Sequence, residues 1–114
     1  MHVFVRTESS RVVALRISAQ SSNSLLVTWQ PPAHSNGPLD VYLMRYRLIQ
    51  VGDCPTLDPS LGRWSRLVDV DANQLRTVVG DLDPYSRYQV KIWARTEAGR
   101  GQVAVAYATT GAAG

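Results

Sequence analysis

Short runs of alternating polar and apolar residues restrict the fold of this chain more than any other feature. The pattern occurs at residues 24–29 (SLLVTW), 41–48 (VYLMRYRL), 75–79 (LRTVV) and 87–94 (RYQVKIWA). Successive side chains of a β-strand point to opposite faces of the sheet, so each run has one apolar face that can be buried. The sequence therefore predicts antiparallel strands that are buried on one side.

Three weaker runs complete the set of predicted strands, at residues 14–18, 64–68 and 102–109. The segments between the runs are rich in Gly, Pro, Asn, Asp and Ser, which favour turns, and no segment has a sustained helical period. Hydrophobic residues make up 45% of the 114 residues, which is enough for a packed core. Seven short strands in a chain of this length predict an all-β, antiparallel β-sandwich.

Two parts of the chain do not follow this pattern of short strands and turns. Residues 1–10 are expected to be a linker or the end of a preceding repeat, and residues 111–114 a tail. Residues 50–63 are expected to form a long surface loop, functional or disordered, that contains the single cysteine, Cys54. Because one cysteine cannot form an internal disulfide, Cys54 is expected to be an accessible free thiol or to pair outside this chain.

Two motifs resemble ligand sites, but the residues around them do not support a ligand site. Residues 99–104 (GRGQVA) match the glycine spacing of a dinucleotide-binding loop, but a strand rather than a helix is predicted after them. Residues 69–74 (DVDANQ) resemble the start of a calcium loop, yet Gln74 stands where that loop needs Gly. We interpret the first as a hairpin loop and the second as a polar turn, and we expect neither a cofactor nor a metal.

The sequence also argues against catalysis and against membrane insertion. The two histidines, His2 and His34, have no strong orienting partner in sequence, and there is no nucleophile elbow or metal-spaced His/Cys cluster. No apolar run approaches the roughly 18 residues that a membrane-spanning helix needs. A net charge of +3 permits an anionic partner without requiring one.

Three segments, in the correct order, resemble a fibronectin type III module. Residues 24–32 (SLLVTWQPP) are similar to its second strand, with a Trp followed by prolines, and residues 41–47 (VYLMRYR) are similar to its third. Residues 78–101 resemble its sixth strand and the turn before it, where a Leu, a Pro and a Tyr precede alternating apolar residues. The likeness covers residues 11–110 and implies a seven-stranded, immunoglobulin-like sandwich of fibronectin type III topology.

The resemblance implies which residues build the structure. Trp29 would fill the space between the sheets, and the hydroxyl of Tyr88 would bond to backbone just upstream, as in a tyrosine corner. The expected signature residues are Trp29, Pro32, Tyr46, Leu82, Pro84 and Tyr88. The residues expected to be buried are Trp29, Tyr46, Leu82, Tyr88, Val90 and Ile92. The chain departs from the family in its long loop at 50–63 and has no Arg-Gly-Asp triplet.

The same topology would place the polar faces of the third and sixth strands side by side. Their basic and aromatic side chains, with one from the following loop, are the candidate partner-binding residues: Arg45, Arg47, Arg87, Lys91, Trp93, Arg95 and Arg100. One interpretation is a site for an anionic partner, such as a glycosaminoglycan or an acidic protein surface. The alternative is an ordinary solvated face on which arginine stems cover Trp93.

The resemblance implies a non-catalytic adhesion, protein-interaction and spacer module in the extracellular part of a multidomain receptor or adhesion protein. The expected partners are a protein or neighbouring domains of the same chain, with a glycosaminoglycan as a further candidate and no nucleic acid. Two alternatives stay open: a repeat of a cytoplasmic muscle-type array, and an accessory domain of a secreted enzyme. The absence of N-x-[ST] glycosylation sites and of paired cysteines suits the first alternative.

Overall fold

The computed structural model describes residues 10–35, 37–51 and 62–111 of the chain. The expectations for residues 1–9, for most of the 50–63 loop with Cys54, and for residues 112–114 lie outside the described residues. Strands are the main element of the described part, which contains no α-helix. The strands are β1 (Val13–Ser21), β2 (Ser24–Gln30), β3 (Leu39–Val51), β4 (Val68–Asp71), β5 (Arg76–Val79), β6 (Ser86–Thr96), β7 (Gly99–Arg100) and β8 (Ala104–Thr109).

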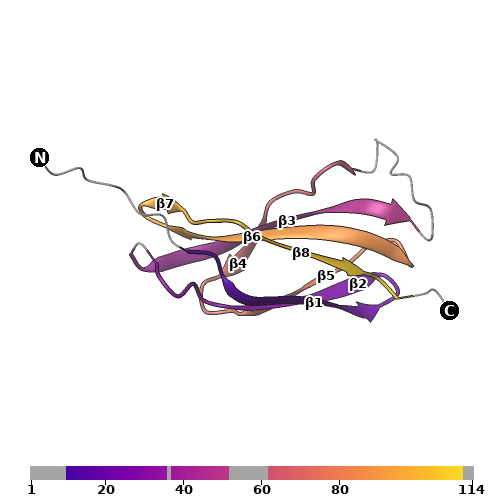
Figure 1. Ribbon diagram of the computed structural model, residues 1–114, viewed down its shortest axis with the longest axis horizontal. Helices are drawn as coiled ribbons and strands as arrows, with labels where there is room; N and C mark the ends of the chain where they lie inside the picture. The colour runs from indigo at the N-terminus through magenta and orange to yellow at the C-terminus, as the bar shows by residue number, and fades with distance from the viewer. Residues whose placement is uncertain (1–9, 36, 52–61, 112–114) are drawn as a thin grey trace, which may run out of the picture.

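The strands form two antiparallel sheets that lie one above the other (Figure 1). One sheet has the order β1-β2-β5, and the other has the order β4-β3-β6-β7, with β8 also paired to β6. We call these the three-stranded sheet and the large sheet. The predicted all-β antiparallel sandwich is therefore confirmed.

The strand count differs from the expected seven because the last strand is interrupted. β7 pairs with the end of β6, at Arg95 and Thr96, whereas β8 pairs with the earlier part of β6, from Arg87 to Ile92. Both segments therefore lie along the same edge of β6. Between them the chain stays close, because the Gly101 amide donates a hydrogen bond of 2.7 Å to the Ala94 carbonyl.

The prediction of a strand at residues 64–68 was wrong in its position. The strand, β4, begins at Val68 and ends at Asp71, so Asp69 and Asp71 belong to it and the polar turn follows. In that turn the Asp71 carboxylate accepts a hydrogen bond of 2.9 Å from the Asn73 amide. This contact ends the strand because Asp favours local side-chain-to-backbone bonding over a continued ladder.

The core lies between the sheets, on the faces that the alternation predicted. Trp29 is 1% exposed and packs edge-on against Tyr42, with ring centroids 5.3 Å apart. Of the residues expected to be buried, Trp29, Leu82, Tyr88, Val90 and Ile92 are buried. Tyr46 is only half-buried, contrary to expectation, because it lines a surface hollow of about 290 Å³ beside Leu48.

The buried side chain of Tyr88 holds the turn between β5 and β6 in place. Its hydroxyl accepts a hydrogen bond of 2.8 Å from the Asp83 amide, five residues upstream, which is the contact expected of a tyrosine corner. Burial raises the pKa of Tyr88 above its usual 10.0, the bond from the Asp83 amide acts in the opposite direction, and the Asp83 carboxylate adds to the increase. The turn is thus tied to the core at the far end of the sandwich from the β6–β7 hairpin.

Candidate functional site: the basic face of the large sheet

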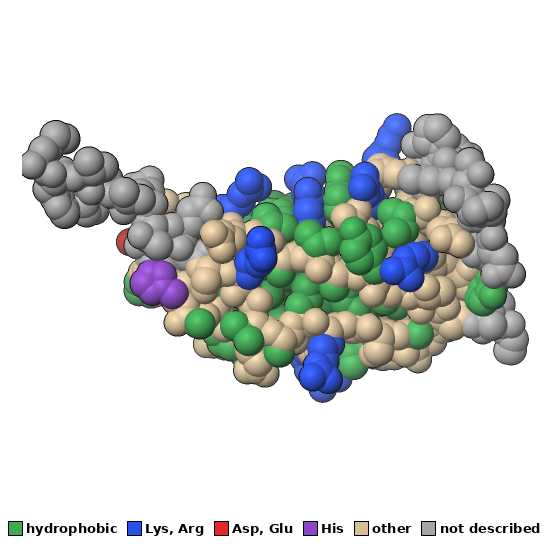
Figure 2. Space-filling view, in the orientation of Figure 1, with side chains coloured by type: hydrophobic (Ala, Val, Ile, Leu, Met, Phe, Trp, Pro, Cys, Tyr) green, Lys and Arg blue, Asp and Glu red, His purple; other side chains and the backbone are tan. Residues whose placement is uncertain are grey.

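The register of β3 against β6 brings most of the candidate binding residues onto one outer face. Arg45 lies directly opposite Lys91, and Arg47 lies opposite Gln89. In Figure 2, Lys and Arg side chains follow the upper edge of the molecule, over the large sheet. We call the outer surface of β3, β6 and β8 the basic face.

An aromatic side chain that the sequence reasoning did not select lies within this face. The Trp64 ring is covered by two cations, with the Arg47 Cζ 4.6 Å and the Lys91 Nζ 4.1 Å from its centroid. Each such contact is worth about 0.5–1 kcal/mol at an exposed site and more where water is excluded. The Trp64 side chain is half-buried. Because both cations lie over its ring, the three side chains form one stacked unit.

Hydrogen bonds with β3 hold the segment around Trp64 in place. The Ser65 amide donates to the Tyr46 carbonyl at 2.8 Å, and the Tyr46 amide donates to the Ser65 hydroxyl at 3.0 Å. The Arg47 guanidinium adds a long bond of 3.4 Å to the Gly62 carbonyl. The sequence predicted Trp64 to lie in a strand and not at the site. The sequence offered one signal of its role at the site: Trp64 follows the long loop that comes directly after the run containing Arg45 and Arg47.

A second group of contacts continues the stack across the sheet to β8. The Arg47 Nε donates to the Gln89 Oε1 at 2.7 Å, and the Gln89 Nε2 donates to the Tyr107 hydroxyl at 3.2 Å. The Arg87 guanidinium lies over the Tyr107 ring, 5.4 Å from its centroid. These contacts order the side chains while leaving Arg87 and Tyr107 exposed to solvent.

The remaining candidates occupy the other end of the face. Trp93 is 6% exposed, so it does not present an open ring among the arginines, and the Arg100 guanidinium lies 5.7 Å from its centroid. Arg95 makes a salt bridge of 3.1 Å with Asp40, and both side chains are about half exposed. Solvent screening makes such a pair worth at most about 1 kcal/mol. The structure therefore divides the candidate residues into two groups. The cations in the middle of the face have no ion-pair partner among the described residues, whereas the charge at the Arg95 end is partly neutralised by Asp40.

Among residues 10–35, 37–51 and 62–111, the charges in the middle of the face have no partner of opposite sign. Arg45 and Lys91 are directly opposite each other, yet no carboxylate in the described part of the chain contacts either of them. Like charges in directly opposed positions destabilise a sheet. The face is therefore a concentration of positive charge that the described residues do not neutralise.

Two other features are absent from the described residues. Residues 10–35, 37–51 and 62–111 contain no group of three or more His, Cys, Asp or Glu side chains that could hold a metal ion. Within the same ranges no helix is long and apolar enough to cross a membrane.

Comparison with known proteins identifies the family. The model of the fibronectin type III domain matches residues 10–109. The chain is 33% identical over 93 residues to human neural cell adhesion molecule L1 and 34% identical over 93 residues to human ephrin type-B receptor 3. These matches cover 81% and 82% of this chain but only 7% and 8% of the two relatives.

A solved structure supports the same fold. The solution structure of the fn3 domain of the human collagen alpha-1(XX) chain superimposes with a TM-score of 0.77 at 22% identity, covering 99% of this chain and 95% of that one. The family match and the structural likeness agree with each other. The chain belongs to the fibronectin type III family.

Proposed function

We propose that this domain is a non-catalytic recognition and spacer module of the extracellular part of a multidomain adhesion protein or receptor, and that its basic face binds an anionic partner. Domains of the same family in adhesion molecules and receptors are similar to it in sequence, which supports the general role. We place the domain at residues 11–110, with linkers on both sides. The anionic partner is an acidic protein surface or a sulfated polysaccharide.

The observation that carries the proposal is the pairing of Arg45 with Lys91. Two cations directly opposite each other cost stability in the isolated domain, and no described carboxylate compensates for them. Lys91 is at the same time held over the Trp64 ring, 4.1 Å from its centroid, so its charge stays on this face. An anion placed between Arg45 and Lys91 would relieve their repulsion and bind to prearranged groups.

The test separates binding from stability. Arg45→Gln removes one charge from the opposed pair without breaking any described contact, whereas reversal at Lys91 or Arg95 would also disrupt the Trp64 stack or the Asp40 salt bridge. We expect Arg45→Gln to elute from a heparin column at lower salt than wild type. We also expect its unfolding free energy to stay equal or to rise by about 0.2–1 kcal/mol.

Arg11→Gln is the matched control. It removes the same charge from an exposed residue that precedes β1 and lies outside the basic face. Its elution should change less than that of Arg45→Gln, because a residue at the site removes a direct contact as well as net charge. Equal losses for the two variants would show a response to overall charge alone and would contradict the proposed site.

A further inference from the structure

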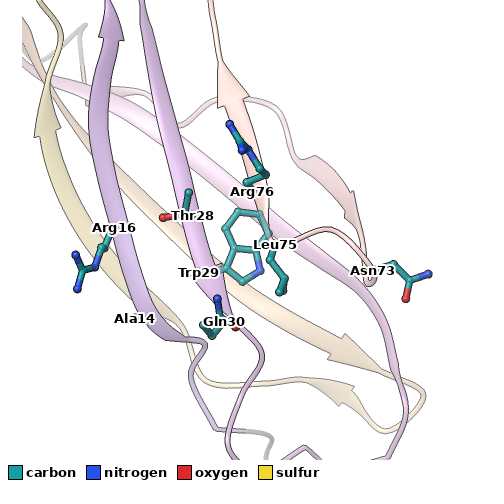
Figure 3. Close-up of a pocket in the computed structure, with 8 residues that line it drawn as sticks. All are labelled: Ala14, Arg16, Thr28, Trp29, Gln30, Asn73, Leu75 and Arg76. Carbon is teal, nitrogen blue, oxygen red and sulfur yellow. The ribbon is translucent and has the colours of Figure 1, made fainter.

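A second basic feature lies on the opposite side of the sandwich, on the outer surface of the three-stranded sheet. Here the surface has a hollow of about 420 Å³ (Figure 3). Its lining comes from β1, β2, β5 and the turn before β5: Ala14, Arg16, Thr28, Trp29, Gln30, Asn73, Leu75 and Arg76. The basic face of the large sheet shares none of these residues.

Strand pairing places two arginines on either side of Thr28. Arg16 of β1 and Arg76 of β5 are both register partners of Thr28 of β2, so the three residues form one row across the sheet. Figure 3 shows the two arginines flanking Thr28 on their separate strands. Because neighbouring strands are about 4.8 Å apart, the Cα atoms of Arg16 and Arg76 are separated by about 10 Å.

Neither guanidinium has a partner within the described residues. No hydrogen bond, ion pair or ring contact joins the side chain of Arg16 or Arg76 to any of them. The sequences of β1, β2 and β5 contain no Asp or Glu. The three-stranded sheet therefore has two unpaired positive charges at a hollow and no negative charge of its own.

The lining of the hollow is partly apolar. Ala14 is exposed and Leu75 is half-exposed, and the amide side chain of Gln30 is exposed at the same hollow. An aliphatic lining beside two guanidiniums fits a peptide that combines acidic and apolar side chains better than a polysaccharide charged along its whole length. Guanidinium groups also match carboxylates in geometry, because they can donate two parallel hydrogen bonds.

From this arrangement we propose that the hollow binds an extended acidic peptide segment of a protein partner, running across the three strands. Side chains at positions i, i+2 and i+4 of an extended peptide share one face, and positions i and i+4 are about 14 Å apart. Acidic residues at i and i+4 reach Arg16 and Arg76, whose long side chains cover the difference from about 10 Å by leaning outward. A small apolar residue at i+2 lies over Thr28.

The experiment is an NMR titration of the isotope-labelled domain at low ionic strength. The probe is a blocked peptide with the core Glu-Ser-Val-Ser-Glu, and the matched neutral peptide has the core Gln-Ser-Val-Ser-Gln. We expect saturable shifts of the amides at residues 14–16, 28–30 and 75–76 with the acidic peptide and no saturable shifts with the neutral one. Arg16→Gln and Arg76→Gln should each weaken binding about fivefold, the value of one exposed charge pair, while Arg11→Gln should have a smaller effect.

Four outcomes would overturn the proposal. They are equal shifts with both peptides, shifts confined to the basic face, unchanged affinity in Arg16→Gln and Arg76→Gln, and tighter binding of a sulfated hexasaccharide than of the peptide at the same amides. The last result would assign the hollow to a polysaccharide. Both arginines are exposed, and the amide spectrum of each variant confirms directly that it is folded.

Discussion

Two buried tyrosines differ in what their hydroxyl groups do. The Tyr88 hydroxyl accepts a hydrogen bond from the Asp83 amide, whereas the Tyr42 hydroxyl makes no hydrogen bond of ordinary geometry with any described residue. Burial raises the pKa of Tyr42, and the adjacent Trp29 indole only partly offsets this increase. Both residues therefore bury a hydroxyl group in the core. The Tyr88 hydroxyl gains a regular hydrogen bond for its lost hydration, and the Tyr42 hydroxyl gains none from the described residues.

Removing each hydroxyl should reveal this difference. Tyr88→Phe leaves the Asp83 amide without its partner and should lower the unfolding free energy by about 0.5–1.5 kcal/mol. Tyr42→Phe removes a buried hydroxyl whose one polar neighbour, the Trp29 indole, makes no hydrogen bond of regular geometry with it, so stability should fall less than in Tyr88→Phe or should rise. Urea denaturation at neutral pH measures both, and a larger loss for Tyr42→Phe than for Tyr88→Phe would contradict this account.

At the scale of a single strand, β1 contains an irregularity beside the hollow. Its pairing with β2 shifts between Val13 and Arg16, and Ala14 lies within that interval with a φ of 56°. This left-handed conformation costs a residue with a Cβ about 1–2 kcal/mol. The bulge places Arg16, rather than its neighbour, opposite Thr28.

Glycine at the bulge should therefore stabilise the domain. Ala14→Gly relieves the left-handed strain at the cost of a more flexible unfolded chain, so a net gain of up to about 1 kcal/mol is expected. Ala19→Gly, at another exposed position of β1 without a positive φ, should instead lose about 0.5–1 kcal/mol. Thermal unfolding of the two variants should move in opposite directions, and a loss in both would show that Ala14 is unstrained.

The segment that contains Trp64 is bonded to β3 but is not itself a strand. It is attached by the two bonds between Ser65 and Tyr46 and by the two cations over the indole ring. Trp64→Leu keeps an apolar side chain but removes both ring contacts, so we expect a loss of about 1–2 kcal/mol. Trp64→Phe retains a π-face and should lose less. Equal stability of the leucine and phenylalanine variants would mean that the ring contributes only apolar area.

For the whole molecule, the raised pKa values of Tyr42 and Tyr88 predict weakening in alkali. In the unfolded chain both hydroxyls ionise near pH 10, whereas in the folded domain burial keeps them protonated to higher pH. The folded state therefore binds more protons above pH 10, and its stability falls as the pH rises through that range. Below pH 10 the contribution of these groups is fully present.

Denaturation midpoints at pH 9 and pH 11 measure this dependence. Wild type should lose more stability between the two values than a Tyr42→Phe, Tyr88→Phe double variant, in which these groups no longer ionise. Parallel curves for wild type and the double variant would exclude the two buried tyrosines as the cause.

The sequence by itself determined which side of β2 and of β6 faces the core. Trp29, Val90 and Ile92 are in the core because alternation is a property of the extended backbone, which local residue order already expresses. The end of β2 before Pro31 is equally local, since proline has no amide to donate to the ladder. The displaced start of β4 shows the limit of such reasoning for short runs, where tertiary pairing decides the bounds.

Only the tertiary structure decided which polar side chains meet. Trp64 contacts Lys91, Arg95 pairs with Asp40, and Arg16 and Arg76 flank Thr28 although they come from different strands. Each meeting depends on the register between strands that are far apart in the sequence. That register is set by how the two apolar faces pack and where bulges interrupt the ladders, and no local run of residues contains this information.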